Sequence, residues 1–316
     1  MGVKISDRDK HIWYLDDYYE KALRARGKLA LAPNLTPDHS SLISDLKQNH
    51  FGVFQSEHLV ADLNRLKFLI DDAFADPSLI STPKHSCFKV KSSEDISRIE
   101  QIDSMPRLCP SEVAEGPDFW RRHTSYVQIR DPLTVIPELL PILLEPTLIA
   151  VMQEYLGALP QLNFVKIQRT WANDAPEIDT QLWHVDLDAR KLMKVFLFLH
   201  DVDEQRGGTR FVRGSHLFDG HIDYPYQDRW SEKEIVDQFG PDAVSAATCE
   251  FGDLFLLDTN LIHRGSRPQL NDRTVVIANF SIHEETVSGG TMRLMPSSLD
   301  NLAPWQLNLL PEAMPA

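Results

Sequence analysis

The chain has 316 residues, 42% of them apolar, which is enough to bury the core of one large domain. Its 32 basic and 46 acidic side chains give a formal charge of −14, which opposes binding to nucleic acid or to an anionic membrane. Three cysteines, Cys87, Cys109 and Cys249, are too sparse for a disulfide scaffold, and the first ten residues hold no apolar signal segment. We therefore expect a cytoplasmic protein whose partner is a small molecule, with no nucleic acid and no membrane.

Residues 1–160 are predicted to be mostly helical. A helical arm is expected over 8–30, and it is equally compatible with a dimer and with a helix packed on its own chain, so the oligomeric state stays open. Thr36 is suited to an N-cap and Pro37 to the first helical position, which predicts that a second helix starts there. Residues 52–55 and 59–75 predict a strand and an amphipathic helix.

The segment 76–130 is polar and rich in serine, proline and charge, and we expect an irregular insert. It is interpreted either as part of a substrate lid or as a surface excursion. Residues 136–156 predict a helix that is interrupted near Pro141 and Pro146 and ends at Gly157.

From residue 161 onward the pattern becomes β-rich. A single helix is expected at 232–239, and strands are expected at 163–170, 194–199, 209–212, 251–257 and 273–280. We expect residues 1–316 to form a single domain, with its β core at 161–285 and a C-terminal tail at 286–316. The helical first half would pack on the outside of that core.

The triplet His184-Val185-Asp186 is followed 77 residues later by His263, at the end of a predicted strand over 252–263, and then by Arg273. A histidine and an aspartate two residues apart on a strand point to the same face. Two imidazoles and one carboxylate on one face of Fe(II) leave positions open for a co-substrate and O2. Arg273 stands where a guanidinium can hold a carboxylate through two hydrogen bonds.

Further motifs lie at fixed distances around this triad. They are Asp201-Val202, Gly207-Gly208, Gly214-Ser215-His216, and Asp258 ahead of His263-Arg264-Gly265. Together they resemble the phytanoyl-CoA dioxygenase family of Fe(II)/2-oxoglutarate-dependent oxygenases. Arg213 departs from the family, which has proline there, and the change affects a turn and not the ligands.

The resemblance implies a mainly β fold with flanking helices, namely a double-stranded β-helix of the jelly-roll, cupin-like type. It also implies Fe(II), with 2-oxoglutarate and O2 as co-substrates, and it does not imply phytanoyl-CoA as the substrate. His184, Asp186 and His263 would be the metal ligands and the catalytic centre. Arg273 would bind the distal carboxylate of 2-oxoglutarate, with Ser266 and Gln168 as further cofactor-binding candidates.

Several residues compete with these assignments. Asp188 also shares a strand face with His184, and Arg264 and Arg267 lie close to Arg273 in sequence. His216 is expected to fix a turn through side-chain hydrogen bonds. Four basic side chains are expected at the mouth of the site, either recognising an anionic group or forming a solvated rim: Lys191, Lys194, Arg210 and Arg213.

The favoured function is therefore the hydroxylation of a small molecule or biosynthetic intermediate, with release of succinate and CO2. Two alternatives come from other classes. One is a non-catalytic β-helix module that binds a metabolite. The other is a cupin-type metalloenzyme that uses no 2-oxoglutarate, and Arg273 is the residue that argues against it.

Overall fold

The computed structural model describes residues 20–29, 35–55, 60–81, 121, 124–174, 177, 179–186, 189–217, 229–282, 292–300, 302–311 and 314–315. Its α-helices are α2 (Pro37–Asn49), α3 (Val60–Ala75), α6 (Pro132–Val135), α7 (Leu139–Leu143), α8 (Pro146–Leu156), α9 (Glu232–Phe239), α10 (Pro296–Leu299) and α11 (Pro304–Leu307). Short 3-10 turns are η1 (Gly27–Leu29), η2 (Pro77–Leu79), η4 (Asp179–Gln181) and η5 (Pro241–Ala243).

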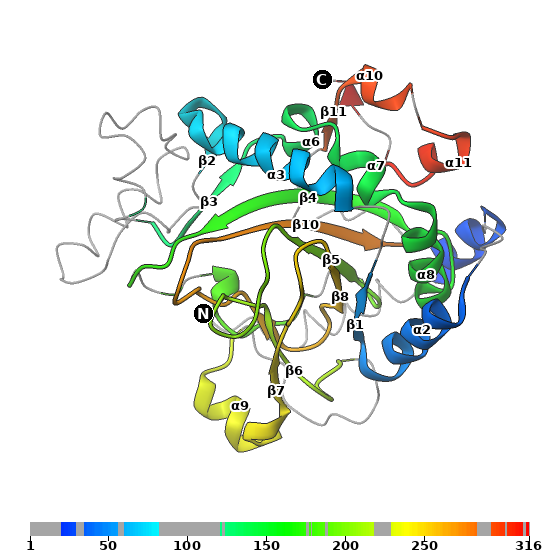
Figure 1. Ribbon diagram of the computed structural model, residues 1–316. Coiled ribbons are helices and arrows are strands. Elements are labelled where there is room, and N and C mark those ends of the chain that lie inside the picture. Colours follow the sequence, from blue (N-terminus) through cyan, green and yellow to red (C-terminus); the bar gives the residue numbers. More distant parts are fainter. Residues whose placement is uncertain are drawn as a thin grey trace.

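A seven-stranded antiparallel sheet forms the larger of two facing sheets. Its strands, in spatial order, are β1 (Phe51–Phe54), β8 (Leu254–Asp258), β5 (Met193–Phe198), β10 (Arg273–Ser281), β4 (Gln161–Thr170), β3 (Tyr126–Ile129) and β2 (Ile80–Ser81). The smaller sheet is β7 (Val244–Ala246), β6 (Arg210–Val212) and β9 (His263–Arg264). In Figure 1, α3 and α7 lie along one side of β4 and β10, while β6, β7 and α9 lie on the other.

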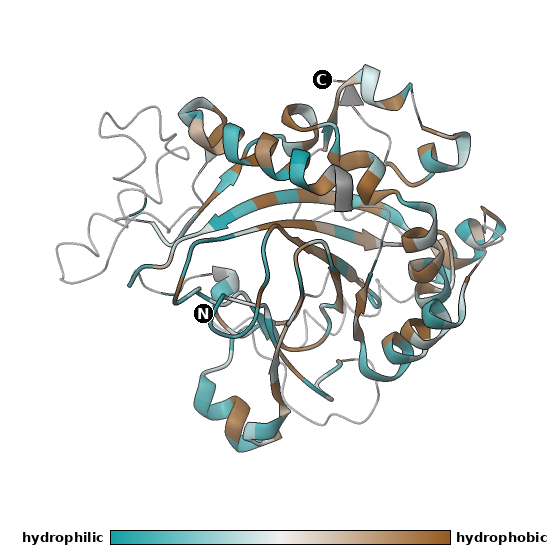
Figure 2. Cartoon of the chain, viewed as in Figure 1, coloured by the Kyte–Doolittle hydropathy of each residue, from teal (hydrophilic) through white to brown (hydrophobic). Residues whose placement is uncertain are grey.

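Side-chain alternation explains why both faces of the larger sheet are buried. On β5, Val195 and Leu197 join the hydrophobic cluster that includes residues of α3, α7 and α8, and Figure 2 shows hydrophobic residues in brown on each of these helices. The alternate residues Phe196 and Phe198 join a second cluster that contains Phe211 of β6. The two sheets therefore pack face to face around an inner apolar layer, as a jelly roll requires.

Most helix boundaries follow from local signals. The Thr36 hydroxyl accepts a hydrogen bond from the His39 backbone, with Pro37 at the first helical position, which confirms the predicted start of α2. Gly157 closes α8 in the left-handed region at φ 86°, also as predicted. The helix expected at 232–239 is α9, capped by Ser231.

Three expectations need correction or lie outside the description. The strand expected over 252–263 is two strands, β8 and β9, because a turn at 259–262 separates them. The ends of the 76–130 segment are regular, since β2 and β3 pair there and extend the larger sheet. Residues 82–120 and the first part of the expected arm, 8–19, lie outside the described residues.

The C-terminal segment packs against the core. Leu309 is fully buried, and its carbonyl accepts a hydrogen bond of 2.7 Å from the Leu162 backbone of β4. A short parallel pair, β11 (Arg293–Leu294) and β12 (Met314–Pro315), lies in the same segment. Among the described helices, none has both the length and the apolarity needed to cross a bilayer.

Candidate metal centre

The backbone brings the two histidines of the predicted triad together. His184 and His263 form an isolated antiparallel bridge, with N–H to carbonyl distances of 3.0 and 2.8 Å in the two directions. Asp186 follows outside any strand, and its backbone N–H donates to Thr259 at 2.9 Å. The expectation of a regular strand at His184–Asp186 is therefore wrong, although the side chains still converge.

The three side chains lie close enough to share one ion. His184 Nε2 is 3.8 Å from Asp186 Oδ1, and His263 Nε2 is 3.5 Å from Asp186 Oδ2. Each imidazole is oriented by its Nδ1, which lies 2.7 Å from the carbonyl of Leu182 in one case and 2.9 Å from that of Leu261 in the other. A carbonyl can only accept, so Nδ1 carries the proton and the Nε2 lone pair faces Asp186.

The electrostatics of the cluster favour the protonation states that a metal needs. Burial lowers the pKa of His263 to about 3, and burial also lowers the pKa of His184. Burial by itself would raise the pKa of Asp186, but the ammonium of Lys194 above all holds it well below its usual range. Two neutral imidazoles and one carboxylate are the forms that bind a divalent metal.

A metal at this position would satisfy an otherwise unsatisfied atom. His184 Nε2 is buried and has no hydrogen-bond partner among the described residues. Buried polar nitrogens normally have a partner, so the donor set fits a metal ligated by His184, Asp186 and His263. The competing carboxylate, Asp188, lies outside the described residues.

Lys194 is part of this centre and not of its rim. Its Nζ donates to Asp186 Oδ2 at 2.5 Å, and its side chain is only 13% exposed. The expectation that Lys194 flanks the mouth is wrong, because alternation along β5 places it on the inner face with Phe196. This alternation is visible in the sequence and was the signal that could have predicted the inward position of Lys194.

Arg273 is a buried cation at the start of β10. It is 3% exposed, and it donates to the carbonyl of Gly207 and, at 3.0 Å, to Thr170 Oγ1. Its Nε has no hydrogen-bond partner, and no acidic side chain among the described residues pairs with it. Burial lowers its pKa to about 10. A buried charge without a counter-charge is costly, so the site suits a bound carboxylate.

The two further candidates differ in what surrounds them. Gln168 donates to Thr170 Oγ1 at 3.1 Å and accepts from Gln128 at 3.2 Å, so it joins the polar row that includes Arg273. Ser266 is buried, and its hydroxyl has no partner among the described residues. Sequence reasoning missed Gln128, because only the pairing of β3 with β4 brings it here.

Arg264 and His216 have partners of their own. Arg264 pairs with Glu177 at 3.0 Å and lies over the ring of Trp183. In the Gly214-Ser215-His216 turn it is Ser215 that fixes the backbone, by donating to Val212 and accepting from Ile262. The ring of His216 lies beside Asp258, with Nε2 3.2 Å from a carboxylate oxygen, and its expected role in the turn stays a prediction.

Comparison with known proteins agrees with this reading of the fold. Residues 123–274 match the family model described as phytanoyl-CoA dioxygenase (PhyH). No curated protein matches the chain.

Solved structures give the same architecture at low sequence identity. The chain is similar to EctD from S. alaskensis with 2-oxoglutarate and 5-hydroxyectoine, at 14% identity and a TM-score of 0.51, over 91% of this chain and 88% of that one. It is also similar to the epimerase SnoN in complex with Fe3+, alpha ketoglutarate and nogalamycin RO, at 12% identity and a TM-score of 0.50, over 77% and 83%. These matches show the double-stranded β-helix fold, and residues 123–274, a little under half of the chain, are similar to the phytanoyl-CoA dioxygenase (PhyH) family model.

Proposed function

We propose that this chain uses Fe(II), 2-oxoglutarate and O2 to hydroxylate a small-molecule substrate, with release of succinate and CO2. The observation that carries the proposal is the convergence of two neutral imidazoles and one ionised carboxylate, from His184, His263 and Asp186. When bound, Fe(II) would supply redox chemistry and open positions for the two co-substrates.

The chain's own residues would prepare that centre. The Nδ1 hydrogen bonds of the two histidines hold their Nε2 lone pairs toward Asp186. Lys194 holds one oxygen of Asp186, which orients the carboxylate and keeps it ionised. The apolar side chains of the inner layer, among them Phe196, would restrict water around the site.

Arg273 would bind the distal carboxylate of 2-oxoglutarate. Thr170 and Gly207 already orient its guanidinium, and the charge has no carboxylate partner among the described residues. Ser266 is proposed as a hydroxyl donor to the same carboxylate, because its buried hydroxyl is otherwise unsatisfied there. Gln168 is proposed to position Thr170 and, through it, Arg273.

The alternatives explain less of what is observed. A module that only binds a metabolite needs no desolvated imidazole pair beside a carboxylate. A cupin-type enzyme that uses no 2-oxoglutarate needs no buried, uncompensated Arg273. The formal charge of −14 supports a small-molecule substrate over nucleic acid, and the sparse cysteines support a reducing, cytoplasmic location.

Succinate formation tests the proposal. Purified protein with Fe(II), ascorbate and 2-oxoglutarate is expected to release succinate slowly even without the true substrate. His184→Ala is expected to abolish this, whereas His39→Ala, in the first turn of helix α2 and outside the proposed ligand set, is the matched control and should not. Absence of succinate, together with absence of 2-oxoglutarate binding in the presence of Mn(II), would contradict the proposal.

A further inference from the structure

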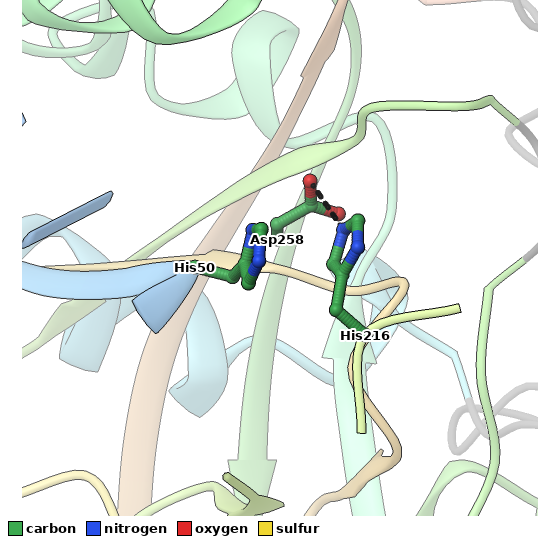
Figure 3. A group of neighbouring side chains, drawn as sticks. All are labelled: His50, His216 and Asp258. Atoms are coloured by element: carbon green, nitrogen blue, oxygen red, sulfur yellow. Dashed lines mark ion pairs between the residues drawn. The ribbon is translucent and has the colours of Figure 1, made fainter. Parts of the chain in front are cut away.

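A second buried cluster includes Asp258, which precedes the turn that leads to His263. Figure 3 shows His50, from the end of α2, His216, and Asp258, from the end of β8. Their exposed fractions are 8%, 3% and 0%, and one ligand atom from each lies within 4.8 Å of the others. The cluster has the same composition as the candidate metal centre, two histidines and an aspartate.

Its geometry nevertheless does not suit a cation. The rings of His50 and His216 are stacked, with centroids 3.8 Å apart and planes 10° from parallel. The lone pairs of stacked rings run side by side and do not converge on one ion. The Asp258 carboxylate already accepts a hydrogen bond of 2.6 Å from Tyr155, and one of its oxygens is 3.2 Å from His216 Nε2. Asp258 is therefore a buried anion supported by donors.

The other oxygen of Asp258 shapes the turn that leads to His263. Oδ1 accepts from the backbone N–H of Asn260 at 3.0 Å and from its side-chain amide at 3.1 Å. The Leu261 backbone N–H donates to the Asp258 carbonyl at 3.1 Å. This network closes the turn at 259–262, and His263 follows it directly.

The same turn is bonded to the segment that follows Asp186. The Asn260 amide also donates to the carbonyls of Ala189 and Arg190, at 3.0 and 3.1 Å. The Thr259 carbonyl accepts from the Asp186 backbone at 2.9 Å, and the Thr259 N–H donates to Leu192 at 3.0 Å. Thus one short turn fixes the distance between two segments that each carry a proposed ligand.

We propose that Asp258 and Asn260 are positioning residues of the metal centre, which hold the His263 turn against the Asp186 segment and so raise the affinity for metal. This inference rests on the proposed function. Neither residue belongs to the proposed ligand set of His184, Asp186 and His263. When the ligand-bearing segments are ordered before the metal binds, no part of the binding free energy is lost in ordering them. Mutation of residues that hold metal ligands in place typically weakens metal affinity by about 10- to 100-fold.

Mn(II) binding to the metal-free full-length chain, measured by calorimetry, tests this directly. Asn260→Ala is expected to raise the Kd for Mn(II) by about 10- to 100-fold. The matched control is Asn163→Ala, which removes an amide hydrogen bond of 2.8 Å from Asn163 on β4 to Ser281 on β10. Neither residue belongs to the turn at 259–262. The control is expected to leave the Kd within about twofold of wild type. Melting temperatures of the metal-free variants separate a loss of stability from a loss of affinity.

A second variant guards against a failure of the first to fold. Asp258→Asn keeps the shape of the side chain and removes its charge, and it is expected to weaken Mn(II) binding by about 10-fold. A Kd for Mn(II) within twofold of wild type in either folded variant would overturn the inference. Failure of both variants to fold would also overturn it, because Asp258 and Asn260 would then be residues required for the stability of the fold. The proposed function itself would be refuted if the wild type did not bind Mn(II), or if His184→Ala bound Mn(II) as tightly as the wild type.

Discussion

Replacement of Arg273 by methionine is expected to remove most of the affinity for 2-oxoglutarate. Burial lowers the pKa of this guanidinium from 12.5 to about 10, which means that burial destabilises its charged form relative to the neutral form by ~3 kcal/mol. A carboxylate bound to the guanidinium would return a free energy of that order, because charge-assisted bidentate pairs in a dry site are strong. At 1.4 kcal/mol per tenfold, the variant should raise the KM for 2-oxoglutarate by roughly 100-fold.

The assay is succinate formation against 2-oxoglutarate concentration, with the Kd in the presence of Mn(II) as a second measure. Arg273→Lys keeps the charge and loses the two-pronged geometry, so it should fall between wild type and methionine. Arg293→Met is the matched control and should leave the KM unchanged, because the side chain of Arg293 is 62% exposed and pairs with Asp131 at 3.7 Å. A KM within threefold of wild type in Arg273→Met would refute the assignment of the carboxylate site.

Three further predictions concern pH, the core and a tight turn. Without metal, the free energy of unfolding should be highest above pH 6.5 and fall toward pH 3, because the unfolded chain protonates His263 while the buried ring stays neutral. Denaturant titrations at pH 7 and pH 5 should show a smaller fall in the free energy of unfolding for His263→Gln than for wild type. An equal fall in both proteins would contradict this prediction. Leu66→Ala should destabilise the protein by about 2–5 kcal/mol, whereas Phe68→Ala on the same helix, 70% exposed, should change it by under about 0.5 kcal/mol. Gly208→Ala should destabilise the protein by about 1–3 kcal/mol in the same assay, since its Cβ would lie 2.1 Å from the carbonyl oxygen of Ala247. An unchanged denaturation midpoint would contradict this, because it would mean that the backbone moves at no cost to remove the clash.

Much of the fold could be predicted because its signals are local. The cap at Thr36 and Pro37, the end of α8 at Gly157 and the helix at 232–239 depend on residues a few positions apart. The strands β5 and β10 each contain a continuous apolar run, Val195–Phe198 and Val275–Ala278, which is typical of strands buried on both faces.

The candidate site was predicted in part, and what was missed depends on contacts between distant segments. The convergence of His184, Asp186 and His263 followed from spacing and resemblance, although the local strand expected there is absent. The turn after β8 was missed because Leu261 and Ile262 resume the apolar pattern of β8 after Asp258-Thr259-Asn260, whose side chains favour a turn.

The place of Lys194 was assigned from charge alone, as a basic residue near the mouth. Alternation along β5 puts it on the same face as Phe196, and the structure places its ammonium beside Asp186. Gln128 was missed for a similar reason, since β3 reaches β4 after a long intervening segment. The single-domain organisation of residues 1–316 and its internal boundaries stay predictions.

The most direct test of the central claim is a crystal structure of the protein with Mn(II) and 2-oxoglutarate under anaerobic conditions. The account predicts one metal ion bound by His184 Nε2, the Asp186 carboxylate and His263 Nε2, with the distal carboxylate of 2-oxoglutarate on Arg273. A metal bound instead between His50, His216 and Asp258, or a 2-oxoglutarate molecule that leaves Arg273 without an anion, would contradict it.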